Sequence, residues 1–332
     1  MGEVARFEVM HALEQSLWEH LKDEAESLFR FKILRSVPIK RGWLNQKWKI
    51  ETNQGTFLLK QYNPERFKKY DLQTIQIALE TQNRAFQNGI RCPELLEHEG
   101  NLLHTSGKGE LFTVMCFMEG DLIKPGEATY QQMESLGEVV GKLHKLFNEG
   151  YMPARSETLF KIPPVSERLQ HWHSTLDKCM DDQRPLFLLQ KEATAKLKDS
   201  DFEYLTPGWC HRDLWVDNLL FSSESVSAIL DFDRMNYDFI ETDIGRLIIS
   251  ACLQKDKLNV EGVHAFIRGY CNTNELSIER LCRSLKVVWY MESTWWISLT
   301  FHEGEPPKRF ANEMIWLAKN MERIDSILLG KM

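Results

Sequence analysis

The spacing of apolar side chains predicts a small, strand-rich region in the first third of the chain. Leucines recur at helical intervals near the start, which predicts an amphipathic helix over residues 7–30. Alternating apolar and polar positions over 33–62, interrupted by an Asn-Gln-Gly turn signal, predict strands that include a β-hairpin. A helix is expected over 71–88, where a glycine and a proline follow, and short strands are expected over 95–104 and 110–118.

The remainder of the chain has mostly helical periodicity. Polar helical spacing covers residues 165–200, and apolar helical faces recur over 242–330. One strand-rich island, residues 209–233, interrupts the helical pattern. We therefore expect an α+β protein of two lobes, with residues 1–118 in the N-terminal lobe and residues 119–332 in a helical C-terminal lobe.

Composition and charge narrow the class of protein. The chain has 332 residues, with 41 basic and 48 acidic side chains, so its net charge is −7, and no basic stripe indicates a nucleic-acid partner. The longest uncharged apolar stretch, 111–118, is too short for a bilayer span, and glutamates interrupt any apolar leader. Seven cysteines without a Cys-x-x-Cys pair indicate reduced thiols. We expect a cytoplasmic protein that binds neither nucleic acid nor membrane, and its oligomeric state is left open.

The strand-rich island carries residues suited to phosphoryl transfer. His211 and Asp213 are followed by Asn218, and a strand, a polar turn and a second strand then lead to Asp231. Transfer from ATP needs a carboxylate that accepts the proton of the attacking hydroxyl, which suits Asp213. It also needs oxygen ligands for Mg²⁺, and a hairpin would bring Asn218 and Asp231 together for this role. A single Asp or Asn at a strand end is usually a turn residue, so the prediction depends on the combination. We expect His211 to support the loop backbone.

This combination of residues resembles the protein-kinase-like fold, and more closely its aminoglycoside phosphotransferase and choline kinase branch, over about residues 35–250. That resemblance implies a small β-rich lobe with one main helix and a larger helical lobe. A protein kinase proper is disfavoured, because Asp233 replaces the glycine of Asp-Phe-Gly and no Ala-Pro-Glu follows. Trp215 stands where serine/threonine kinases carry lysine. The glycine-containing segment 136–144 also resembles this branch, and we expect close helix packing at its glycines.

The resemblance implies further residues on the ATP side. Lys60 would face the α- and β-phosphates of ATP, and Glu80 on the following helix would be its partner. Gly42 and Asn45 match the phosphate loop of the branch, although an ordinary hairpin turn would explain either residue alone.

The resemblance also implies main-chain and supporting contacts. Main-chain groups of Cys116 and Phe117 would bond the adenine edge. Asp243 is expected to cap a helix and bond the catalytic loop, and Asp233 is expected as an accessory ligand of the metal or the phosphate.

The acceptor site is expected in the helical lobe. Trp289, Glu292 and Trp296 share helical spacing, and two indoles around a carboxylate suit a cationic amine. The alternative is a core-facing aromatic stripe. Asp238 and Glu241 could contact an amine or could be solvated loop charges. The sequence leaves the identity of the acceptor open.

We expect an ATP- and Mg²⁺-dependent phosphotransferase that acts on a hydroxyl of a small molecule, such as an aminoglycoside-like compound, an amino alcohol or a related metabolite. The alternative is a catalytically silent kinase-like structural or binding protein, similar to spore-coat homologues. The presence of Lys60, Asp213, Asn218 and Asp231 argues against a silent protein.

Overall fold

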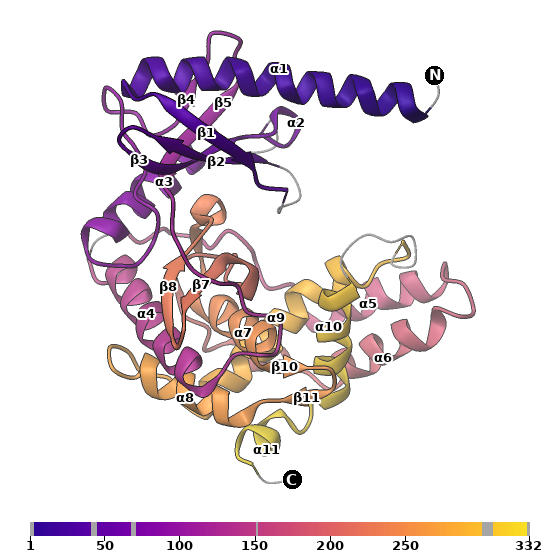
Figure 1. Cartoon of the computed structure of the whole chain (residues 1–332). Coiled ribbons are helices and arrows are strands. Elements are labelled where there is room, and N and C mark those ends of the chain that lie inside the picture. The colour runs from indigo at the N-terminus through magenta and orange to yellow at the C-terminus, as the bar shows by residue number, and fades with distance from the viewer. Residues whose placement is uncertain (1–2, 41–44, 68–70, 151, 301–307, 331–332) are drawn as a thin grey trace. The chain divides into compact units, whose positions relative to one another are not determined.

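The computed structural model consists of two compact units, Met1–Met118 and Glu119–Met332 (Figure 1). The structure describes residues 3–40, 45–67, 71–150, 152–300 and 308–330.

Unit 1 is built on an antiparallel sheet with the strand order β1-β2-β3-β5-β4. Its strands are β1 (Ile33–Pro38), β2 (Gln46–Thr52), β3 (Gly55–Gln61), β4 (His104–Thr105) and β5 (Leu111–Cys116). The predicted hairpin is confirmed: Thr52 pairs with Gly55 across a two-residue turn, and Gly55 has a φ of 142° that disfavours other residues. The strand predicted over 95–104 is wrong in extent, because Leu95 forms only an isolated bridge with Met115.

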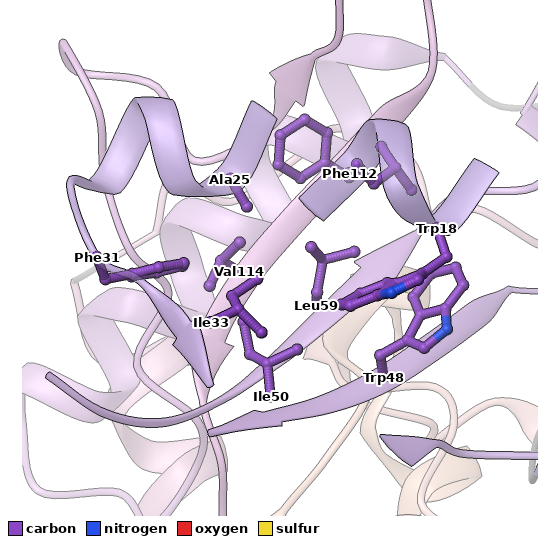
Figure 2. Packing of buried hydrophobic residues seen from close by; sticks show 10 residues of the cluster. Trp18, Ala25, Phe31, Ile33, Trp48, Ile50, Leu59, Phe112 and Val114 are labelled. Carbon is purple, nitrogen blue, oxygen red and sulfur yellow. The ribbon is translucent and has the colours of Figure 1, made fainter. Parts of the chain in front are cut away.

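Helix α1 (Glu3–Phe29) covers one face of this sheet and supplies much of the core of unit 1. Figure 2 shows side chains of α1 meeting those of the strands, and the rings of Trp18 and Trp48 lie 5.2 Å apart between centroids. The other helices of unit 1 are α2 (Pro64–Phe67) and α3 (Leu72–Gln87). Asp71 caps α3 by accepting hydrogen bonds from the backbone N–H groups of Gln73 and Thr74.

Unit 2 is mainly helical, and its helices pack in pairs. The helices are α4 (Tyr130–Asn148), α5 (Val165–Leu176), α6 (Arg184–Ala195), α7 (Ile240–Cys252), α8 (Val260–Tyr270), α9 (Ile278–Trp296), α10 (Lys308–Asn320) and α11 (Ile324–Leu328). Helix α4 packs on α8, α7 on α9, and α5 on α6. A side chain at Gly137 would collide with the carbonyl oxygen of Phe266 in α8, which confirms the predicted close packing.

The described part of unit 2 also contains three two-stranded antiparallel sheets. They pair β6 (Pro207–Cys210) with β9 (Asn236–Phe239), β7 (Leu219–Ser222) with β8 (Ser225–Ile229), and β10 (Leu253–Gln254) with β11 (Lys257–Leu258). The sequence prediction missed β9, β10 and β11, because such short strands leave little periodicity to detect. Among the described residues, no helix is both long and apolar enough to cross a bilayer.

Candidate active site

The loop after β6 holds the carboxylate of Asp213 by both of its oxygens. The side-chain amide of Asn218 donates to Oδ2 over 2.9 Å, and the indole Nε1 of Trp215 donates to Oδ1 over 3.1 Å. The guanidinium of Arg234 lies 3.6 Å from Oδ1. Because a donor from a different residue contacts each oxygen, the carboxylate plane has a defined orientation.

The two predicted metal ligands lie at the base of one hairpin. Strands β7 and β8 are paired with Leu219 opposite Ile229, and the backbone N–H of Leu230 donates to the carbonyl oxygen of Asn218 over 2.8 Å. Asn218 therefore precedes one strand and Asp231 follows the other shortly after it ends, as the predicted hairpin requires.

The donor chemistry at the hairpin base fits Mg²⁺. The Nδ2 of Asn218 donates hydrogen bonds to Asp213, so the side-chain oxygen of Asn218 is the atom that could bind a metal. Asp231 could supply a carboxylate oxygen. Within the described ranges, no group of three His, Cys, Asp or Glu side chains could hold a metal. Mg²⁺ at kinase sites is bound by one or two side chains together with substrate phosphates, so two protein ligands are sufficient.

Two residues of this region have left-handed backbone conformations. Arg212 has a φ of 65° and Asp231 has a φ of 62°, values that are uncommon for residues other than glycine. Strained backbone of this kind clusters at functional sites, where surrounding contacts hold it in place. At Arg212 such contacts lie on both sides: its N–H donates to Oδ1 of Asp243, and its carbonyl oxygen accepts from Nη1 of Arg246.

His211 is buried and connects the loop to the strand that leads to Asp231. Its Nε2 donates to the carbonyl oxygen of Leu230 over 3.1 Å, and its Nδ1 accepts the backbone N–H of Asp213 over 3.3 Å. One neutral tautomer satisfies both bonds. Burial lowers the pKa of His211, against the opposing effect of Asp243 and other carboxylates, which favours this neutral form. The ring therefore contacts backbone groups, as expected for a loop support.

Asp243 is fully buried and joins the loop after β6, residues 211–218, to helix α4. Its carboxylate accepts the backbone N–H groups of His211 and Arg212, each over 2.7 Å, and Nε2 of His144 over 3.2 Å. Burial alone would raise the pKa of Asp243, but the hydrogen bond and charge of His144, with His211 and Arg212, hold it below its usual value. The expected capping role is wrong, because Phe239 occupies the N-cap position of α7.

Two candidate acceptor carboxylates, Asp238 and Glu241, are buried and bound to partners within unit 2. Asp238 forms an ion pair with Nε of Arg212 at 2.9 Å. Glu241 accepts from the backbone N–H of Thr206 at 2.9 Å and from Nε of Arg280 at 2.8 Å. Neither is a solvated loop charge, because a charge buried this deeply must be paired.

The aromatic stripe of α9 divides between the core and the catalytic loop. Trp289 is fully buried and donates to Oε1 of Gln190 over 2.8 Å, so it lies in the core. Glu292 is also buried, accepts Nε1 of Trp296 over 3.0 Å and forms an ion pair with Arg246. Trp296 stacks on Phe310 with ring centroids 4.5 Å apart. The members of the stripe therefore do not share one environment.

Sequence reasoning missed several residues that contact the loop. It assigned no role to Trp215 or Arg246, although both lie inside the motifs that it used, and it did not consider Phe310. It also named no partner for Asp217, whose Oδ2 lies 2.6 Å from Nη2 of Arg309. No local signal relates positions in α10 to the loop, because they meet only in the tertiary structure.

In unit 1, Lys60 lies on β3 and Glu80 lies on α3. Lys60 is 3% exposed, and its Nζ lies 5.1 Å from the ring centroid of Tyr62. Glu80 is half-buried and accepts from Nε2 of Gln76 over 3.2 Å. Their pairing remains a prediction.

The remaining ATP-side residues flank the sheet of unit 1. The side-chain oxygen of Asn45 accepts the backbone N–H of Asn63 over 3.2 Å, and Gly42 lies outside the described residues. The N–H of Cys116 donates to the carbonyl of Glu94 at 2.8 Å, and that of Phe117 donates to Thr56 at 3.1 Å. Because these two amides already have acceptors, the predicted adenine contacts of Cys116 and Phe117 remain a prediction, and their N–H groups are not free to make them.

Comparison with known proteins agrees with the geometry of the loop. Residues 36–280 match the model of the Phosphotransferase enzyme family, and the chain belongs to that family. Its family is therefore one of phosphotransferase enzymes.

Curated relatives and solved structures cover most of the chain. A homoserine kinase of Rhodopseudomonas palustris (strain BisB18) is 23% identical, and the match covers 72% of this chain and 70% of that protein. A homoserine kinase of Sinorhizobium medicae (strain WSM419) is 26% identical, and the match covers 73% of this chain and 72% of that protein. The amicoumacin kinase hAmiN, solved with AMP-PNP and Ca²⁺, superposes with a TM-score of 0.60 at 16% identity, covering 93% of each chain. A microcompartment-associated aminopropanol kinase has a TM-score of 0.57 at 12% identity, covering 92% of this chain and 99% of that one. The protein-kinase-like fold is therefore shared.

Proposed function

We propose that this protein transfers the γ-phosphate of ATP, with Mg²⁺, to a hydroxyl of a small molecule, and that Asp213 is its catalytic base. The observation that supports this proposal is the arrangement around Asp213: a carboxylate held by Asn218 and Trp215, beside a hairpin whose base carries Asn218 and Asp231. A structural turn would not require both carboxylate oxygens to be held.

In this mechanism the protein orients the two substrates and handles one proton. Asp213 accepts the hydrogen bond of the acceptor hydroxyl and takes its proton as the new O–P bond forms and ADP leaves. Asn218 and Asp231 would hold Mg²⁺, which supplies charge neutralisation on the phosphates. Lys60, with Glu80 as its partner, would contact the α- and β-phosphates. The amicoumacin kinase binds AMP-PNP and Ca²⁺, which supports our proposal that this protein binds a nucleotide together with a divalent cation. We expect the protein to work in the cytoplasm, where ATP is supplied.

The acceptor that we propose to test first is an amino alcohol. The curated relatives described above are named homoserine kinases, and one structural neighbour is an aminopropanol kinase. Both names denote small molecules that carry an amine and a hydroxyl. Homoserine and aminopropanol should therefore head a panel that also contains choline-like amines, aminoglycosides, macrolides and sugars.

The decisive experiment is an ADP-release screen of this panel with Asp213→Asn as the blank. The substitution keeps the size of the side chain and removes its charge, so transfer should fall about 10²–10⁴-fold, as is typical for a lost general base. The exposed residue Asp181 offers a matched control, since Asp181→Asn is the same chemical change far along the chain from the loop. Equal activity of Asp213→Asn and the wild type would contradict the proposal.

The metal assignment is tested separately by calorimetric titration of ATP. We expect tighter ATP binding in Mg²⁺ than in EDTA, because without the cation the phosphates and the carboxylate of Asp231 are both negatively charged. Asp231→Ala should abolish this enhancement. Equal ATP affinity in Mg²⁺ and EDTA would count against a metal site at the hairpin base.

A further inference from the structure

We propose that Trp215 is a positioning residue that orients Asp213 through its indole N–H, and that helices α9 and α10 hold this indole in place. The inference rests on the proposed function of Asp213 as the base, and it concerns a residue for which the family resemblance predicts no role.

The indole N–H of Trp215 provides the hydrogen bond to Oδ1 of the Asp213 carboxylate. Asn218 binds Oδ2 and Trp215 binds Oδ1. Without the indole N–H, the guanidinium of Arg234, at 3.6 Å, is the partner that remains to Oδ1 among the described residues. A carboxylate held at one oxygen can rotate about its Cβ–Cγ bond, because this torsion is broad. Rotation would move the lone pair that must face the acceptor hydroxyl.

The indole itself is held among aromatic and cationic neighbours. Trp215 is 7% exposed, and the guanidinium carbon of Arg246 lies 4.8 Å from its ring centroid. The ring of Phe310 lies 4.2 Å away between centroids at an interplanar angle of 56°, and the ring of Trp296 lies 6.3 Å away, edge-on at 79°. Contacts of these kinds fix the plane of an aromatic ring and therefore the direction of its N–H bond.

A buried ion pair connects these neighbours to the loop backbone. Arg246 donates through Nη1 to the carbonyl oxygen of Arg212 over 2.6 Å and is paired with Glu292 on α9. Glu292 also accepts Nε1 of Trp296, which stacks on Phe310 of α10. Glu292, Trp296 and Phe310 lie beyond residue 280, where the family match ends. The loop is thus supported by a part of the chain that lies outside the family match.

The alternative is that Trp215 only fills space beneath the loop. Trp215→Phe separates the two roles, because phenylalanine keeps an aromatic ring in the core and lacks the N–H donor. Trp172→Phe is the matched control: Trp172 is fully buried on α5 and donates its own Nε1 to Thr194 over 3.1 Å, so it loses the same kind of bond away from the catalytic loop.

We expect Trp215→Phe to lower kcat about tenfold, the factor that corresponds to the loss of one hydrogen bond to a charged group. The KM for ATP should stay within twofold, and the melting temperature should change no more than in Trp172→Phe, whose kcat should equal that of the wild type. A fall in kcat of less than threefold for Trp215→Phe, or an equal fall for Trp172→Phe, overturns the inference.

A double-mutant cycle with Asp213→Asn shows whether Trp215 acts through the carboxylate. Single-turnover rates with the acceptor found in the screen should show no further loss when Trp215→Phe is added to Asp213→Asn. An equal tenfold loss in that background would mean that Trp215 acts independently of Asp213. This result would overturn the inference about Trp215 and leave the proposed function intact. If Asp213→Asn were instead as active as the wild type, both the proposed role of Asp213 and the inference about Trp215 would be contradicted.

Discussion

The buried carboxylate of Asp243 offers the sharpest test of how the catalytic loop is held. We consider Asp243→Asn, which keeps the shape of the side chain and replaces one oxygen with an NH₂ group. Oδ2 accepts two hydrogen bonds, from His211 and His144, and Oδ1 accepts one, from Arg212. The amide is best accommodated with its oxygen at the Oδ2 position, so the N–H of Arg212 then faces a donor.

The magnitude follows from these three bonds. A buried donor left without an acceptor costs about 1–3 kcal/mol, and each of the two retained bonds loses about 1 kcal/mol when its acceptor becomes neutral. The sum is about 3–5 kcal/mol of unfolding free energy, in the range found when a buried ion pair loses one partner. For a unit of this size the melting temperature should fall by about 10 °C.

The assay is thermal unfolding monitored by calorimetry, with the exposed Asp181→Asn as the control. The interactions that lower the pKa of Asp243 give stability that is present above the ordinary carboxyl pKa and is lost as the pH falls through the lowered value. The difference between the wild type and Asp243→Asn should therefore be full at pH 7 and shrink in acid. A fall of less than 2 °C at pH 7, or a difference that grows in acid, would refute this account of Asp243.

Three further predictions follow from other buried groups. Lys60→Ala should lower turnover by about 10²-fold while the melting temperature changes by only a few degrees, measured by ADP release and calorimetry; a collapse in melting temperature would show a structural role instead. Burial raises the pKa of Glu313 to about 8, although Arg309 opposes the shift. The folded protein therefore loses stability as the pH rises from about 4.5 to 8, because the buried carboxyl group must then ionise. Glu313→Gln should raise the melting temperature at pH 8 and leave it unchanged at pH 4. Gly137→Ala should destabilise unit 2 by about 2 kcal/mol or more in urea unfolding, because its methyl group would collide with the carbonyl oxygen of Phe266. The control is Gly150→Ala, which should cost only about 1 kcal/mol, because Gly150 has a φ of 78° but open space around it.

The features of this protein that can be predicted from sequence are those with local signals. The hairpin of β2 and β3 follows from alternation and a turn. The hairpin that separates Asn218 from Asp231 follows from two apolar runs around a polar turn. The prediction that Asp213 acts as a base also rests on local spacing, because a carboxylate followed by Asn218 and Asp231 in that order suits phosphoryl transfer. Each of these features depends on residues that are close together along the chain.

The contacts of the buried polar residues of unit 2 depend instead on long-range packing. Asp238 and Glu241 look like loop charges in the sequence, yet each is buried against an arginine. Trp289 and Trp296 share one helical stripe, but one donates to Gln190 in the core and the other contacts Glu292. These partners are set by how separate helices pack.

The support of the catalytic loop has the same origin. Trp215 contacts Arg246, Trp296 and Phe310, residues from three different helices. A local pattern shows that Trp215 has an apolar body and a polar N–H, but it does not show what either part meets. Packing brings α7, α9 and α10 together and so determines that the N–H reaches Asp213, because long-range burial selects the partners that local spacing leaves open.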